Sequence, residues 1–134
     1  VMAIAKACRV EKSNKGWGVG IALSQISTNS SIDFDGVRQL SLLVSHQDQV
    51  CNISSDAELI ASSDFCEYFA VRWGEFFISV QGHPEWAAAY SRDLMIDRKG
   101  RIPPDVLSLG LASLERETNE DIFIARVLDF LKSA

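Results

Sequence analysis

A histidine and a glutamate separated by a single proline are the residues of this chain best suited to proton transfer. Pro84 fixes its own φ angle and favours an extended backbone at His83. Side chains two positions apart in an extended segment point to the same side, so His83 and Glu85 are expected to share a face. A carboxylate there holds one imidazole nitrogen protonated and leaves the other free to act as a base. The pattern predicts the base and the orienting group of a catalytic triad, without its nucleophile.

The simpler interpretation of such a tripeptide is a turn at the end of a strand, and the surrounding sequence bears on the choice. The apolar run Phe76–Val80 precedes it and predicts a strand covered on both faces. A second apolar run, Gln39–Val44, is followed by the polar cluster Ser45–Asp48. Ligands of open α/β sheets bind beyond the carboxyl ends of the strands. These two polar segments hold both histidines of the chain, His46 and His83, and therefore predict one shared site.

Several motifs follow one another along nearly the whole chain in a consistent order. Together they resemble the second half of a class I glutamine amidotransferase domain, and the likeness is closest to the GMP-synthase-like branch. Each motif is weak alone, but their order and spacing are fairly specific. The motifs are Val10–Lys12 with Gly16–Gly18, Ser45–Val50, Ala61–Ser63, Val80–Glu85 and Leu107–Leu131.

The resemblance implies an α/β fold, a flavodoxin-like open sheet with flanking helices, and residues 1–134 as the C-terminal part of a single domain. In this family the nucleophilic cysteine lies on a Gly-x-Cys-x-Gly elbow, which this chain does not contain. The elbow is expected just before Val1, with Val1–Ala7 as the rest of the helix that follows it. A half-domain of this kind is expected to leave Leu40–Val44, or a strand near it, with an unpaired edge or an uncovered face.

The resemblance also implies roles for individual residues. His83 and Glu85 are the expected catalytic residues. Main-chain atoms of Ser45, His46 and Gln47 are expected to bind the α-carboxylate and α-amino groups of glutamine, although the family commonly has glycine where Gln47 stands. No metal or organic cofactor is implied. Trp86, directly after the triad glutamate, is expected either to wall the active site or to begin the core of the next helix.

The activity implied is hydrolysis of the glutamine side-chain amide through a Cys-His-Glu triad and a γ-glutamyl thioester. The ammonia would pass to an acceptor held by a synthetase partner, whose identity is open. One alternative is a γ-glutamyl peptide hydrolase on the same fold. Another is a non-catalytic regulatory module that retains the fold.

Composition narrows the class of partners. A formal net charge of −5 with scattered Lys and Arg argues against nucleic-acid binding. No apolar run approaches the length of about 20 residues that a membrane span needs. The three cysteines, Cys8, Cys51 and Cys66, lack metal-ligand spacing, which favours a reducing compartment such as the cytoplasm. Cys51 and Cys66 are expected to be packing residues.

Hydrophobic periodicity and turn residues predict the elements that must position these side chains. The strands expected are Arg9–Lys12, Trp17–Ile26, a strand ending at Ser45, Leu59–Ser62, Tyr68–Arg72 and Phe76–Val80, and the helices expected are Val1–Ala7, Trp86–Ile96, Pro104–Leu114 and Glu120–Leu131.

Overall fold

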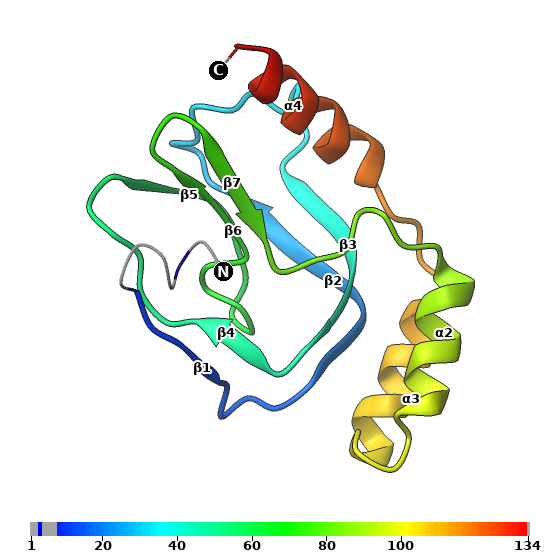
Figure 1. Cartoon of the computed structure of the whole chain (residues 1–134). Helices are drawn as coiled ribbons and strands as arrows, with labels where there is room; N and C mark the ends of the chain where they lie inside the picture. The colour runs from blue at the N-terminus through cyan, green and yellow to red at the C-terminus, as the bar shows by residue number, and fades with distance from the viewer. Residues whose placement is uncertain (1–2, 4–7, 134) are drawn as a thin grey trace.

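A computed structural model describes Ala3 and residues 8–133 of the chain. Strands fill the first part of the chain and helices the last part (Figure 1). The helix expected over Val1–Ala7 lies, apart from Ala3, outside the described residues. The elements are β1 (Val10–Lys12), β2 (Gly18–Ile26), β3 (Gln39–His46), β4 (Asp48–Val50), β5 (Ala57–Ser62), β6 (Ala70–Trp73), β7 (Phe77–Val80), α2 (Ala88–Asp97), α3 (Pro104–Ser113) and α4 (Glu120–Ser133).

The described strands form a five-stranded sheet in the order β3-β2-β5-β6-β7 and a small β1-β4 pair. Neighbouring strands are antiparallel throughout. The long β2–β3 ladder runs from Gly18 opposite His46 to Gln25 opposite Gln39. In contrast, β2 pairs with β5 only at Gln25 and Ile26, so no described strand pairs with most of the other edge of β2. The sheet curls at this place (Figure 1).

Two groups of helices cover different parts of this sheet. α2 and α3 lie side by side, and α4 lies apart from them near the C-terminus (Figure 1). The first pair packs on a cluster that contains Ile21, Leu43 and Met95. Phe123 of α4 packs into a separate cluster with Leu40 and other buried residues. Strand β3 therefore has apolar cover on both faces, because its successive side chains enter the two clusters alternately.

The contact between α3 and β2 depends on two glycines. A Cβ at Gly20 would lie 2.5 Å from the Gly110 carbonyl oxygen, and Gly20 has φ of +83°. A Cβ at Gly110 would lie 2.7 Å from Val19. Because neither position has room for a side chain, helix and strand backbones come close together. Ser113 of α3 thereby accepts a 2.9 Å hydrogen bond from the Ile21 N–H at the edge of β2.

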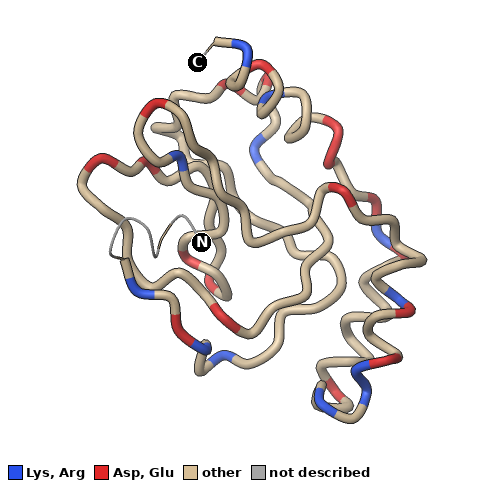
Figure 2. Tube along the Cα trace, viewed as in Figure 1, with Lys and Arg blue, Asp and Glu red and all other residues tan. Residues whose placement is uncertain are grey.

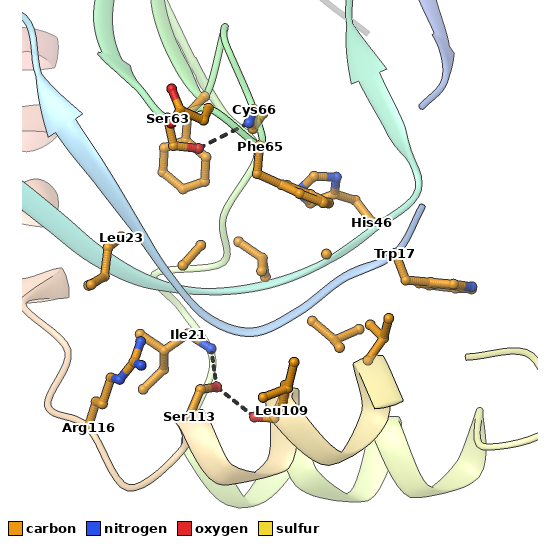
Figure 3. A pocket seen from close by; sticks show the side chains of 18 residues that line it. Trp17, Ile21, Leu23, His46, Ser63, Phe65, Cys66, Leu109, Ser113 and Arg116 are labelled. Atoms are coloured by element: carbon orange, nitrogen blue, oxygen red, sulfur yellow. Dashed lines mark hydrogen bonds between the residues drawn. The ribbon is translucent and has the colours of Figure 1, made fainter. Parts of the chain in front are cut away.

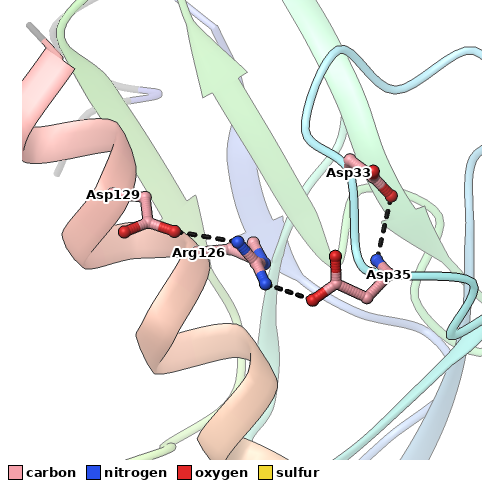
Figure 4. Close-up of polar contacts among 4 residues, drawn as sticks. All are labelled: Asp33, Asp35, Arg126 and Asp129. Atoms are coloured by element: carbon pink, nitrogen blue, oxygen red, sulfur yellow. Dashed lines mark hydrogen bonds and ion pairs between the residues drawn. The ribbon is translucent and has the colours of Figure 1, made fainter.

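The loop between β2 and β3 is tied to α4 by one arginine (Figure 4). Arg126 is bonded to Asp129 of its own helix at 2.8 Å and to Asp35 of the loop. Asp35 has φ of +55°, and its N–H donates to Asp33 Oδ1 at 2.9 Å. This Asx-type turn presents the Asp35 carboxylate to the helix, so α4 is held by a polar contact as well as by its apolar face.

One expectation about exposure needs correction, and one about strand edges does not. The strand predicted over Phe76–Val80 exists as β7, the terminal strand of the sheet, but Phe76 and Phe77 are 59% and 51% exposed, so the start of this run is not covered on both faces. The residues of Leu40–Val44 are buried, with Leu40 and Leu42 fully so. β3 is nevertheless the terminal strand of the sheet, and its neighbour β2 has a stretch of edge that no described strand pairs with, as the expectation of an unpaired edge on Leu40–Val44 or a strand near it allows. The short strand β4 is a further difference, since the sequence pattern places Asp48 in a polar turn.

Acidic and basic residues are interspersed along the described chain (Figure 2). Within the described residues, no helix has the length and apolar character needed to cross a membrane. In the same part of the chain, His, Cys, Asp and Glu side chains form no group of three or more that could hold a metal ion.

Candidate active site

The backbone of the His-Pro-Glu segment fixes its histidine to the middle of β3. The His83 N–H donates a 2.7 Å hydrogen bond to the Leu43 carbonyl, and Gly82 pairs with Val44 in an antiparallel bridge. A Cβ at Gly82 would lie 3.1 Å from the Phe69 ring. The glycine therefore allows the segment to lie close to β3, and this close approach sets the position of the histidine.

The structure brings His83 and Glu85 together. His83 Nδ1 and Glu85 Oε1 are 2.7 Å apart, and the Trp86 N–H donates to the His83 carbonyl at 3.2 Å to close a turn around Pro84. An ionised carboxylate can only accept a hydrogen bond, so Nδ1 carries the proton in this pair. Nε2 is then the nitrogen left for proton transfer.

Opposing effects act on the carboxyl group of Glu85. Partial burial raises the pKa of Glu85, whereas the hydrogen bond with His83, the backbone N–H of Glu85 and the charge of His83 lower it. The lowering effects prevail, and the pKa lies below its ordinary value. Glu85 is therefore ionised at neutral pH, as its role of acceptor for the Nδ1 proton requires.

Trp86 contacts both the candidate base and the core, although it precedes α2, which begins at Ala88. Its ring stacks on the His83 imidazole with the centroids 3.7 Å apart. The same side chain packs against the apolar cluster beneath α2 and α3. One residue thus connects the candidate base to the core.

Of the three residues expected to bind substrate, Ser45 and Gln47 each have a partner elsewhere in the fold. Ser45 Oγ accepts a 2.7 Å hydrogen bond from the guanidinium of Arg98, at the end of α2. The Gln47 carbonyl accepts a 2.8 Å hydrogen bond from the Ser13 N–H. The Gln47 carbonyl is thus already engaged in holding the turn.

The two histidines lie on opposite faces of β3, but the charge of His83 still acts on the pKa of His46 and lowers it, so a shared site stays a prediction. His46 is the last residue of β3, and its ring lies 6.2 Å from that of Phe65, on the Val44 side of the strand. His83 stacks instead on Trp86, on the side covered by α2 and α3. The antiparallel pairing of Gly82 with Val44 sets His83 beside Leu43, three positions before His46 along β3.

Comparison with solved structures finds proteins of a similar fold. A glutamine amidotransferase from Thermotoga maritima superposes with a TM-score of 0.74 at 16% identity, covering 97% of this chain and 57% of the other. The chain has a class I glutamine amidotransferase fold. A candidate GMP synthase subunit from Thermoplasma acidophilum matches with a TM-score of 0.57 at 22% identity, covering 74% of this chain and 50% of the other. The α/β fold class predicted from sequence, and the resemblance that led to it, are confirmed.

Sequence comparison points the same way. Gamma-glutamyl peptidase 3 of Arabidopsis thaliana is 24% identical over 108 residues, which cover 76% of this chain and 42% of the relative. No known protein-family profile matches the chain. The chain spans about half the length of the relatives it matches, both in sequence and in structure.

The amidotransferase fold of this chain also contains a cavity of about 560 Å³ along the free edge of β2 (Figure 3). Its lining includes His46, and also Leu23 and Leu109, which are 40% and 73% exposed. Neither His83 nor Glu85 lines it. The cavity is therefore separate from the His-Glu pair.

The surroundings of Cys66 and Cys51 do not favour a role as the nucleophile for that pair. Burial raises the pKa of the Cys66 thiol to about 11, although Lys15 acts in the opposite direction. A thiol of this kind is protonated at neutral pH and is a poor nucleophile. The half-buried Cys51 donates its S–H to the Gln49 carbonyl at 3.4 Å. Both behave as packing residues.

Sequence reasoning missed Arg98 at this site. It lies 53 positions from Ser45, and no local pattern links the two. The only sequence signal was its place at the end of a predicted helix, where basic residues are common.

Proposed function

We propose that the chain is the base-bearing half of an enzyme that transfers the γ-glutamyl group of glutamine to water through a cysteine thioester. The observation that carries the proposal is the 2.7 Å contact between His83 Nδ1 and Glu85 Oε1, on the fold of the class I glutamine amidotransferases. A nucleophilic cysteine is proposed to come from the part of the domain that matched relatives have beyond this chain.

In the proposed reaction, the cysteine thiolate attacks the side-chain amide carbon of glutamine. His83, as imidazolium, donates a proton to the departing nitrogen, so that the C–N bond breaks and ammonia leaves. Neutral His83 then takes a proton from water, which attacks the thioester. The C–S bond breaks, and glutamate is released. Glu85 keeps the imidazole oriented and stabilises its protonated form.

A second candidate is hydrolysis of γ-glutamyl peptides by the same residues. The match to gamma-glutamyl peptidase 3 favours it, and only the leaving group differs, an amine instead of ammonia. The match to a candidate GMP synthase subunit favours transfer of the ammonia to a synthetase partner. Cys51 and Cys66 form no disulfide, which fits the reducing environment of the cytoplasm, where we propose that the enzyme acts.

The test uses the full-length protein, with the nucleophile-bearing part of the domain present. Ammonia release from L-glutamine and amino-acid release from γ-glutamyl dipeptides are measured in parallel. His83→Ala is expected to lower kcat by about 10³-fold or more, and Glu85→Gln by about 10²-fold or more. Cys66→Ser serves as the control and should leave kcat unchanged.

The relative rates on the two substrates decide between the amidotransferase and the peptidase. Wild-type turnover in His83→Ala would rule out the proposed base. Absence of release from both substrates in the wild-type protein would favour the non-catalytic module.

A further inference from the structure

A single arginine is fixed over the end of β3 on the same side as the His-Glu pair. Arg98 follows the last residue of α2, and its NH1 donates a 2.7 Å hydrogen bond to Ser45 Oγ. Its Cζ lies 5.9 Å from the ring centroid of Trp17. The hydroxyl and the aromatic face hold the half-buried guanidinium in one place, although it extends from the end of a helix.

This positive charge has no protein counter-ion in the described part of the chain. No carboxylate of those residues lies within 4.0 Å of Arg98, whereas Arg126 is paired with two aspartates. A guanidinium has five N–H donors, and one of them is used on Ser45. The others can form the bidentate pair with a carboxylate for which arginine is suited.

The residues of β3 that anchor Arg98 and the candidate base are separated by a distance comparable to the length of a glutamyl group. Ser45, which holds Arg98, is two residues beyond Leu43, which holds His83. Residues i and i+2 of a strand lie on one face about 7 Å apart. In an extended glutamine, four C–C bonds of about 1.5 Å separate the α-carboxylate carbon from the amide carbon, a span of about 5 Å. The two anchors are thus far enough apart for one glutamine to extend from the guanidinium to the imidazole.

We propose that Arg98 binds the α-carboxylate of the glutamyl substrate and so places the γ-carbonyl group next to His83. The inference rests on the proposed function and specifies its substrate class, namely compounds with a free α-carboxylate on a γ-glutamyl group. Ser45 then acts through Arg98, by orienting the guanidinium with its side-chain hydroxyl. The side-chain hydroxyl of Ser45 thus has a role of its own, in addition to the substrate contacts expected from the main-chain atoms of Ser45.

Arg101 provides a matched control for Arg98. It carries the same charge, lies three residues away in the same α2–α3 connection, and is exposed. Arg101→Ala therefore removes one positive charge from the same region without removing the group held by Ser45. If only the positive charge in this region mattered, Arg98→Ala and Arg101→Ala would have the same effect on substrate binding.

The kinetic test compares L-glutamine with L-glutamine α-amide, which lacks the α-carboxylate, as substrates of the full-length enzyme. Arg98→Ala is expected to raise KM for L-glutamine about 10- to 100-fold with a smaller effect on kcat. For L-glutamine α-amide, KM should be the same in Arg98→Ala as in the wild-type enzyme. Arg98→Lys should recover part of the loss, and Arg101→Ala should behave as wild type. The kinetic values for the two substrates are compared as a ratio within each variant. The fraction of folded enzyme is the same for both substrates and therefore cancels from this ratio.

A binding measurement separates this inference from the proposed chemistry. In a His83→Ala background, L-glutamine or its α-amide is titrated while the indole N–H signal of Trp17 is followed by NMR. L-glutamine should shift the signal, the α-amide should not, and Arg98→Ala should abolish the response. The inference is overturned if Arg98→Ala weakens both ligands equally, or if L-glutamine leaves the Trp17 signal unchanged. Neither result depends on turnover.

Discussion

The rings of Trp86 and His83 are stacked, with centroids 3.7 Å apart and planes 4° from parallel. Tyr90 meets the ring of Trp86 at an edge, with a centroid distance of 4.9 Å and an angle of 69°. Glu85 fixes one nitrogen of the imidazole by a hydrogen bond, and Trp86 fixes the plane of the ring. The two contacts together leave the imidazole a single orientation, which is the condition for efficient proton transfer at Nε2.

Removing the stack should slow the chemistry without weakening substrate binding. We expect Trp86→Ala to lower kcat about 3- to 10-fold, the scale of an aromatic pair, with KM little changed. Trp86→Phe should retain most of the activity because a flat ring remains. In NMR spectra, Trp86→Ala should also remove the ring-current shift of the His83 protons. Unaltered His83 signals in that variant would refute the stacking role.

The stability of the fold should fall as the pH falls below 6.5, and His46 should account for part of this. Burial lowers the pKa of His46, and the charge of His83 acts in the same direction, while the backbone and charge of Asp48 oppose them. The unfolded imidazole takes up a proton near 6.5, whereas the folded one does so only at lower pH. Between those two values the unfolded state binds more protons, so the free energy of unfolding decreases by at most about 1.4 kcal/mol per pH unit.

Urea denaturation of the wild type and of His46→Gln at several pH values measures this dependence. The pH values should cover about 5 to 7.5, within the range of about 5 to 8 in which proteins are usually most stable. The variant should lose less stability on acidification than the wild type does. Equal pH dependence in the two proteins would contradict the assignment to His46.

Asn119 should be among the polar residues most important for stability. Its Oδ1 accepts a 2.7 Å hydrogen bond from the Ser41 N–H, its Nδ2 donates to the Gln39 carbonyl at 2.8 Å, and its backbone N–H donates to the Ser41 carbonyl at 3.1 Å. The residue thus takes the place of a neighbouring strand along the outer edge of β3. We expect Asn119→Ala to lower the free energy of unfolding by about 1–3 kcal/mol, since it leaves backbone groups of β3 unpaired.

The control for this change is Asn29→Ala, in an exposed loop. It should alter stability by less than about 0.5 kcal/mol, as is usual for surface substitutions. Similar losses in the two variants, measured by urea denaturation, would argue against the edge-pairing role of Asn119.

The sequence was sufficient to predict the features that depend on neighbours in the chain. The pairing of His83 with Glu85 follows from their separation by Pro84, because an extended backbone makes such side chains share a face. The long apolar strands β2 and β3 and the helices α3 and α4 were also predicted close to their observed bounds. Each of these has a periodic pattern long enough to identify its type.

Features set by distant parts of the chain were not predictable in this way. The run that became β7 has the composition of a central strand, and only the strand order shows that it is an edge strand with Phe76 and Phe77 exposed. The short β4 is defined by its pairing with β1 and by the Gln81 side chain, which accepts a hydrogen bond from the Val50 N–H. The contact of Arg98 with Ser45 likewise requires the whole of α2 to be in place.

The close approach of Gly20 to Gly110 gives a criterion for recognising relatives when overall identity is low. A side chain at either position would push α3 outward and separate Ser113 from the Ile21 N–H. Homologues that preserve this spacing must keep both positions free of side chains, whatever happens to the apolar residues around them. A homologue that has lost both glycines together should have α3 displaced from β2, and its cavity beside that strand should differ in shape.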